Sequence, residues 1–144
     1  MFHRSALHTR HLVTVLGALT LIGTIATPSA FARIIRNTID PVASVTDKGR
    51  HLIVTGPIEC THGERVYIQL TVTQRLTGAI AEGRTLLACD GEGSPQQWIV
   101  DAATHGWERF QPGPATAVAS ARTIRRGKTT DAHQWLVGIS LVEE

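Results

Sequence analysis

Apolar and polar residues alternate with a period of two along most of this chain, and this alternation limits what it can fold into. In the clearest run, residues 66–72, Val66, Ile68, Leu70 and Val72 share one parity and Tyr67, Gln69 and Thr71 the other. Successive side chains of a β-strand point to opposite faces, so the run predicts a strand with one buried face. Similar runs recur at residues 52–60, 85–89, 98–102 and 133–141. With turn-forming segments between them, they predict an all-β, antiparallel sandwich or barrel.

Two stretches are less regular. Residues 115–124 are rich in alanine, which favours a helix, but β-branched residues interrupt them and two prolines precede them. We predict a strand with small inward side chains there, with a helix as the alternative. Residues 33–43 have no strong period and contain Pro41, which predicts an N-terminal arm or an edge strand.

The first 32 residues differ in kind from the rest. Two arginines precede an apolar run at residues 12–26, and a small-residue triplet ending at Ala32 follows it. This order predicts a secretory signal peptide over residues 1–32, cut between Ala32 and Arg33. A membrane anchor is the alternative, but the apolar run is shorter than the roughly 20 residues a spanning helix needs. The sequence therefore predicts a secreted protein with no membrane span after cleavage.

Removing this segment changes the charge balance. The chain has 14 Lys+Arg and 12 Asp+Glu, and residues 1–32 hold two of the arginines and no acidic residue. The exported part, residues 33–144, is therefore neutral by this count. Its composition argues against a nucleic-acid partner, whose binding needs a basic surface.

Cys60 and Cys89 both lie in the exported part. An even number of cysteines in an exported domain predicts a disulfide between them. The alternative is a reactive thiol, with His62 close to Cys60 as its base.

A longer pattern surrounds these cysteines. Residues 54–74 join a strand ending in a cysteine, a Gly-containing turn and a threonine-rich strand ending in Thr-Gln. Cys89 precedes a turn and the strand that begins at Trp98, and a Phe-Gln-Pro-Gly-Pro-Ala step follows at residues 110–115. This pattern resembles small secreted bacterial immunoglobulin-like domains of uncharacterised function.

The resemblance implies an antiparallel immunoglobulin-like β-sandwich of about seven strands over residues 44–144. It transfers no catalytic residue. The order of residues departs from antibody-type domains, because Trp98 follows Cys89 instead of lying between the two cysteines.

Candidate chemistry is sparse. The histidines of the exported part lack the spacing of a zinc site, and the turn at residues 90–94 lacks the remainder of a calcium loop. Motifs of serine hydrolases, metalloproteases, phosphate loops and dinucleotide sites are absent from the sequence. We predict no catalytic, cofactor-binding or metal-binding residue. A glycosidase pair drawn from the acidic residues would have to converge in three dimensions, and candidates are Asp90, Glu92, Asp101 and Glu108.

Two features are candidates for contact with a partner. Trp107 lies in a predicted turn, where it either packs over a sheet edge or is exposed to stack on a sugar ring or anchor a partner. Arg125, Arg126 and Lys128 form a cationic cluster that is either solvated or docks on an anionic polymer.

The functional hypothesis is a secreted, non-catalytic binding or structural module, stabilised by one disulfide, with an unknown extracellular or cell-envelope partner. The alternatives are a small secreted hydrolase or hydrolase inhibitor, and a cell-surface accessory domain that binds polysaccharide through Trp107. A pocket with facing carboxylates or three histidines would favour an enzyme, and an exposed aromatic or basic loop would favour a binder.

Overall fold

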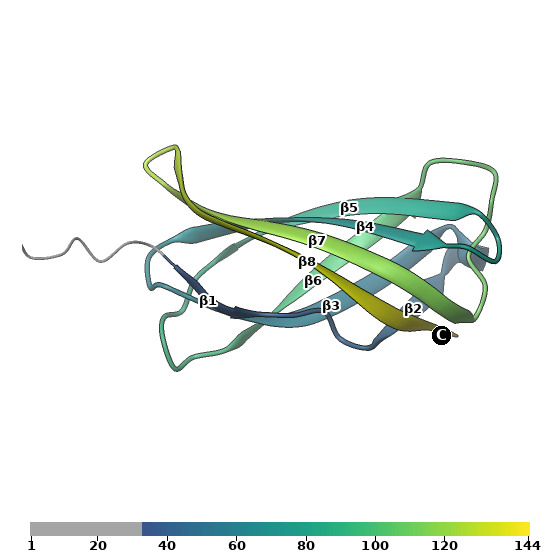
Figure 1. Ribbon diagram of the computed structural model, residues 1–144, viewed down its shortest axis with the longest axis horizontal. Helices are drawn as coiled ribbons and strands as arrows, with labels where there is room; N and C mark the ends of the chain where they lie inside the picture. The colour runs from purple at the N-terminus through teal and green to yellow at the C-terminus, as the bar shows by residue number, and fades with distance from the viewer. Residues whose placement is uncertain (1–32) are drawn as a thin grey trace, which may run out of the picture.

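The computed structural model describes residues 33–144, and β-strands make up most of them (Figure 1). A single 3-10 turn, Asp47–Gly49, follows the second strand. Among the described residues no helix is long and apolar enough to cross a membrane. The predicted signal peptide lies outside the described residues. The strands are β1 (Ile34–Asn37), β2 (Val42–Thr46), β3 (His51–Cys60), β4 (Arg65–Gln74), β5 (Ala79–Ala88), β6 (Gln96–Thr104), β7 (Gly113–Arg125) and β8 (Lys128–Glu143).

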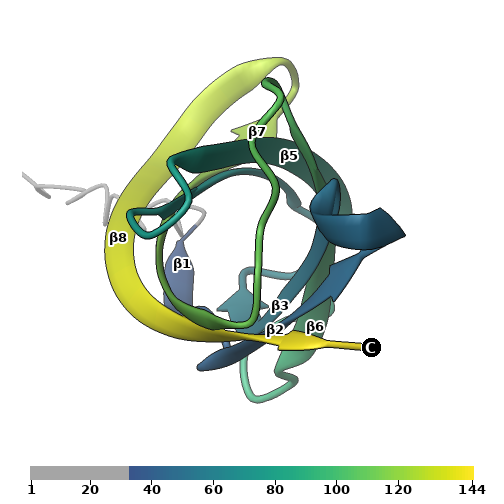
Figure 2. The same cartoon turned by 90° about the vertical axis from the view of Figure 1, so that its right-hand side faces the viewer.

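The strands form one sheet that closes on itself. Its order is β1-β3-β2-β8-β7-β4-β5-β6, and β3 also pairs with β6, so the strands from β2 to β8 complete a seven-stranded ring (Figure 2). The ring is antiparallel except where β2 runs parallel to β8. The predicted immunoglobulin-like sandwich is therefore wrong, although the all-β class is confirmed. Alternation reports which side chains point inward, and a sandwich and a barrel satisfy it equally.

Two pairings make the difference between a barrel and a sandwich. The β3–β6 ladder runs from His51↔Ala103 to Ile58↔Gln96, nearly the whole length of both strands. The β5–β6 ladder is short, pairing Ala81 with Thr104 and Glu82 with Ala103. Together they join β6 to both of its neighbours and leave no break between two sheets.

The inward positions fill the barrel as the alternation predicts. Trp98 is 1% exposed, and the inward positions of β3 and β4 are completely buried. Residues 115–124 lie in β7, so the predicted strand is confirmed and the helix is excluded. Its inward side chains are small because the barrel has little room opposite Trp98 and the leucines, and they are Ala115, Ala117, Ala119 and Ala121.

Residues 34–46 lie along one edge of β3. β1 pairs with the end of β3 at Ile58–Cys60, and β2 pairs with its beginning at His51–Ile53. Between them the chain crosses Gly56, where an added Cβ would lie 2.2 Å from the carbonyl oxygen of Thr38. Glycine is required there because this segment approaches the β3 backbone closely.

The predicted disulfide is confirmed. Cys60 at the end of β3 is bonded to Cys89 just after β5, with 5.5 Å between the two Cα atoms. The bond joins strands that are not neighbours in the sheet, at the end of the barrel where β1 begins. The reactive-thiol alternative is wrong because neither described cysteine is free.

Candidate functional site

One edge of strand β8 is paired over only part of its length. One edge pairs with β7 along almost its whole length, whereas the other pairs with β2 only at Ser140–Glu143. β1 lies beside the earlier part of β8 but shares no ladder with it in the described sheet. β1 begins near the end of the barrel that carries the β7–β8 hairpin (Figure 1) and is separated from β8 by an unpaired gap. We call this opening between β1 and residues 131–138 of β8 the seam.

The backbone of β8 presents hydrogen-bonding groups to the seam. The N–H of Ser140 donates to the carbonyl oxygen of Pro41 at 2.8 Å, so Ser140 faces the β2 side. Backbone groups of alternate residues point to the same edge of a strand. Those of Gln134, Leu136 and Gly138 therefore point into the seam, and unpaired groups of this kind are a template for another strand.

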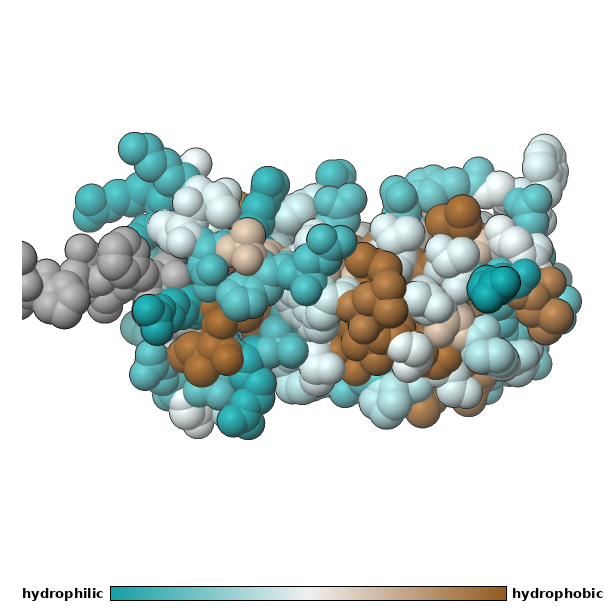
Figure 3. Space-filling view, viewed as in Figure 1, coloured by the Kyte–Doolittle hydropathy of each residue, from teal (hydrophilic) through white to brown (hydrophobic). Residues whose placement is uncertain are grey.

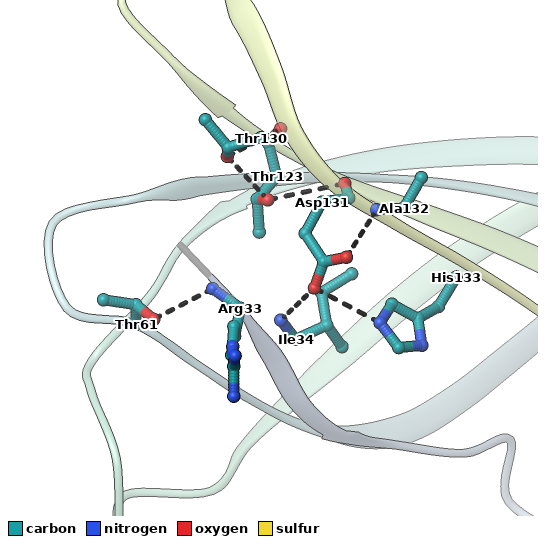
Figure 4. A network of polar contacts seen from close by, with 8 residues as sticks. All are labelled: Arg33, Ile34, Thr61, Thr123, Thr130, Asp131, Ala132 and His133. Atoms are coloured by element: carbon teal, nitrogen blue, oxygen red, sulfur yellow. Dashed lines mark hydrogen bonds and ion pairs between the residues drawn. The ribbon is translucent and has the colours of Figure 1, made fainter. Parts of the chain in front are cut away.

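Asp131 bridges the seam close to the β7–β8 hairpin (Figure 4). Its Oδ2 accepts the N–H of Ile34 at 2.9 Å and lies 3.2 Å from His133 Nε2, while its Oδ1 accepts the N–H of Ala132 at 2.9 Å. Burial alone would raise the pKa of this carboxyl. The Ile34 hydrogen bond, the charge of His133 and the Ala132 hydrogen bond outweigh burial, so the pKa of Asp131 lies below its ordinary value of 3.8.

Next to this bridge is a cleft with two unsatisfied donors. It has a volume of about 390 Å³ and is lined by β1 together with residues 133–135 of β8. Asn37 and Trp135 line it, and their Nδ2 and Nε1 atoms are buried without an acceptor among the described residues. Buried donors without an acceptor are costly, so a ligand that supplies carbonyl oxygens would be favoured where a shift of these side chains lets it reach them.

The surface over the seam is partly apolar. Ile35 is 44% exposed and Leu136 is 69% exposed. Figure 3 shows brown, hydrophobic patches on the face that carries β1 and β8. A segment docked along the β8 edge would find both backbone groups and apolar side chains within reach.

The outer part of the seam gathers acidic residues. A cleft of about 610 Å³ is lined by Glu59, Glu92 and Asp131 together with Arg33 and His133. A general acid needs a pKa close to the working pH, whereas that of Asp131 is lowered. Glu59 already accepts the N–H of Gly93 through Oε1. Asp131 and Glu59 thus each accept a hydrogen bond from neighbouring backbone. This arrangement suits a structural role better than acid catalysis.

The predicted partner-contact residues lie at opposite ends of the barrel. Arg125, Arg126 and Lys128 form the tip of the β7–β8 hairpin, close to the seam, and Trp107 lies in the β6–β7 loop at the other end (Figure 1). Trp107 is 91% exposed, so the alternative that it packs over a sheet edge is wrong. The structure therefore does not bring these residues into one site.

The three cationic residues also differ from one another. Arg125 Nε lies 3.4 Å from Oε1 of Glu64, a carboxylate that is only 3% exposed. Arg126 has φ 49° and Gly127 φ 78°, which is the backbone of a tight two-residue hairpin turn. All three are exposed, but only Arg125 forms an ion pair with a carboxylate among the described residues.

Three histidines in the described part of the chain, His51, His105 and His133, each contact one carboxylate, whereas His62 Nδ1 contacts the backbone oxygen of Asp90 at 3.1 Å. His51 contacts Asp101 at 2.8 Å and His105 contacts Glu82 at 3.2 Å. Residues 33–144 contain no group of three or more His, Cys, Asp or Glu side chains placed to hold a metal ion.

Sequence reasoning missed the seam and the residue that clamps the opposite end. Gln74 is completely buried at the end of β4, and its amide both donates to Gln111 O at 2.8 Å and accepts from Gln111 N at 3.0 Å. The sequence does indicate a buried role for Gln74, because a glutamine on the inward parity of an apolar strand needs buried hydrogen-bond partners. The seam left no such signal, because it depends on which strand edges meet.

Comparison with known proteins adds little to this geometry. No family model and no curated protein matches the chain. It is similar to AggA, the major subunit of aggregative adherence fimbriae type I from Escherichia coli, at 10% identity and a TM-score of 0.41, covering 78% of this chain and 95% of that one. It is also similar to the Pseudomonas fluorescens alkylpurine DNA glycosylase AlkC bound to DNA containing an abasic site analog, at 12% identity and a TM-score of 0.29, covering 78% of this chain and 30% of that one. Neither likeness is close enough to carry an argument about this chain.

Proposed function

We propose that this chain is an exported, non-catalytic binding module that holds an extended polypeptide segment along the seam. The observation that carries the proposal is the pair of buried donors, Asn37 Nδ2 and Trp135 Nε1, in a cleft beside the unpaired edge of β8. A strand added to that edge would supply carbonyl oxygens to the donors and ladder bonds to residues 132–138.

Export belongs to the same proposal. We propose that residues 1–32 are a signal peptide removed before Arg33, that residues 33–43 are an arm, and that residues 44–144 are the binding domain. The Cys60–Cys89 bond supports this, because disulfides persist in oxidising compartments. N-terminal sequencing of the protein released by the producing cell tests the cleavage, which is expected to leave Arg33 first. A product that begins upstream of Arg33 would contradict it.

The position of the hairpin tip suggests how a segment is oriented. Arg126 and Lys128 are exposed beside the hairpin end of the seam. We propose that they contact the partner and favour acidic residues at one end of the bound segment. Trp107 lies too far away to share this contact.

A library of displayed random peptides, selected on residues 33–144, tests the proposal. The recovered peptides are expected to bind as extended strands and to slow amide exchange in residues 132–138. Leu136→Pro removes one N–H from the seam edge without touching the β7 ladder, and Leu136→Ala is its matched control. We expect Leu136→Pro to weaken binding at least tenfold and Leu136→Ala to have a much smaller effect.

A second variant tests the donors. Trp135→Phe keeps an aromatic ring and removes the indole N–H, and we expect it to weaken binding about fivefold, the effect of one neutral hydrogen bond. Recovery of no peptide, or of peptides that bind wild type and Leu136→Pro equally, would overturn the proposal.

A further inference from the structure

A third cleft, of different chemistry, lies at the end of the barrel opposite the seam. It lies between the 3-10 turn after β2 and the loop between β6 and β7, and its volume is about 430 Å³. Its functional side chains are Asp47, Arg50, His51, His105, Trp107 and Arg109. We propose that this cleft binds an acidic saccharide, with one sugar ring stacked on Trp107 and a uronate carboxylate held by Arg50 and Arg109.

The aromatic side of this proposal rests on Trp107. It is 91% exposed, the most exposed of the large hydrophobic side chains, and its neighbours in the cleft are polar or small. A protein partner is usually anchored by an aromatic residue within a wider apolar surface. A single indole surrounded by charged groups instead matches a sugar ring, which has an apolar C–H face and a rim of hydroxyl groups.

The charges of the cleft select an anion. Arg50 and Arg109 line it, and neither is paired with a carboxylate among the described residues. His51 and His105 each contact a carboxylate, Asp101 and Glu82 respectively, and neither of these carboxylates lines the cleft. The cleft therefore sets two unpaired guanidinium groups against the one carboxylate of Asp47. Guanidinium binds carboxylate with two parallel hydrogen bonds.

The histidine pairs also prepare the cleft for hydroxyl groups. Asp101 engages Nδ1 of His51, and Glu82 engages Nε2 of His105. Each ring is held by one nitrogen, and its second nitrogen has no hydrogen bond to a described residue. Together with Asp47 these groups supply donors and acceptors for the rim of a sugar.

The backbone around the cleft is fixed before any ligand arrives. Phe110 N donates to Gly49 O at 3.0 Å, and Thr104 N donates to Arg50 O at 2.9 Å, which ties the two walls together. Gly49 has φ +85°, and a Cβ there would lie 2.4 Å from the carbonyl oxygen of Phe110. Because the walls are already ordered, little conformational entropy is lost on binding.

Affinity electrophoresis of residues 33–144 tests the proposal, with gels that contain polygalacturonate, dextran, gelatin or no polymer. We expect polygalacturonate alone to retard the protein, and Trp107→Ala to abolish the retardation. Leu76→Ala is the matched control, because Leu76 is 74% exposed but does not line the cleft. Arg50→Gln and Arg109→Gln are each expected to weaken binding about tenfold, the effect of a charge-assisted hydrogen bond.

The controls separate this site from general attraction between charges. Arg126→Gln removes an exposed arginine at the other end of the barrel, and it should leave the retardation unchanged. An equal loss in Arg126→Gln and Arg50→Gln would overturn the proposal, as would retardation by dextran equal to that by polygalacturonate. Retardation by gelatin alone would assign the cleft to a protein partner and overturn it too. No retardation in any gel would do the same. None of these results affects the seam, which shares no residue with this cleft.

Discussion

The two ends of the barrel are held closed in different ways. At the Trp107 end, β2 pairs with β8 through backbone hydrogen bonds, and the buried Gln74 amide clamps the β6–β7 loop. At the seam end, β1 and β8 share no ladder. The Asp131 carboxylate connects β8 to β1 there, and the Cys60–Cys89 disulfide connects the end of β3 to the segment after β5. One end is closed by continuous backbone pairing and the other by a few side chains.

This difference decides what each end can bind. A rigid end displays side chains in fixed positions, which suits a small ligand recognised by an indole and two guanidinium groups. An end with an unpaired strand edge offers backbone groups, which suit an extended polypeptide. The same sheet thereby supports two kinds of recognition.

Removing the disulfide should have the largest effect on this comparison. Cys60 and Cys89 are 29 residues apart, and replacing both by alanine should lower the free energy of unfolding by roughly 3 to 4 kcal/mol in the chain-entropy model. Chemical denaturation measures the loss, and hydrogen exchange locates it. We expect faster exchange in β1 and at the Cys89 end of β5, with little change near Gly49 and Phe110. Uniform loosening at both ends would show that they are not held independently.

Breaking the Gln74 clamp tests the opposite end. Gln74→Leu keeps the inward position filled by a side chain of similar size but leaves the N–H and C=O of Gln111 unpaired. We expect the free energy of unfolding to fall by about 2 kcal/mol. Gln69→Leu is the control, since Gln69 lies exposed on the same strand. The clamp variant should also weaken polygalacturonate binding, because it loosens the loop that carries Trp107. A Gln74→Leu protein as stable as Gln69→Leu would show that the clamp contributes nothing.

The strands themselves were readable from the sequence. The runs at residues 52–60, 66–72 and 133–141 appear as β3, β4 and β8, and the disulfide followed from an even cysteine count in a predicted exported domain. Each is a local property or a count. The inward parity of a strand is set by its own side chains, so alternation alone predicts it.

The closure of the sheet into a barrel could not be predicted from the sequence. Whether β6 pairs with both β3 and β5 depends on registers between strands far apart in the chain, and no local pattern reports them. The seam is a consequence of closure and was missed with it. Trp107 was identified as a candidate contact, but its neighbours Arg50 and Arg109 come from distant segments that only the fold brings together.

The Asp131 bridge predicts a pH dependence confined to the seam end. The folded-state pKa of Asp131 lies below its ordinary value of 3.8, so the bridge stabilises the fold above that value and the stabilisation is lost as pH falls through the folded pKa. Asp131→Asn should cost about 1.5 kcal/mol at neutral pH, the effect of charge-assisted hydrogen bonds. Chemical denaturation at several pH values should show wild type and variant converging in acid. A constant gap down to the most acidic pH would contradict the bridge.

The smallest expected effect separates two adjacent arginines on the hairpin tip. Arg125 Nε lies 3.4 Å from Oε1 of the buried Glu64, whose Oε2 has no hydrogen-bond partner among the described residues, whereas Arg126 forms no ion pair with them. Arg125 is itself 59% exposed, and solvent weakens such a pair, so Arg125→Gln should cost about 1 kcal/mol. Arg126→Gln should leave the free energy of unfolding unchanged and affect only the binding of acidic peptides. Equal stability of the two variants would contradict this role for Arg125 and place both arginines in the solvated tip. Glu64 would then lack a stabilising partner, which is costly for a carboxylate that is 3% exposed.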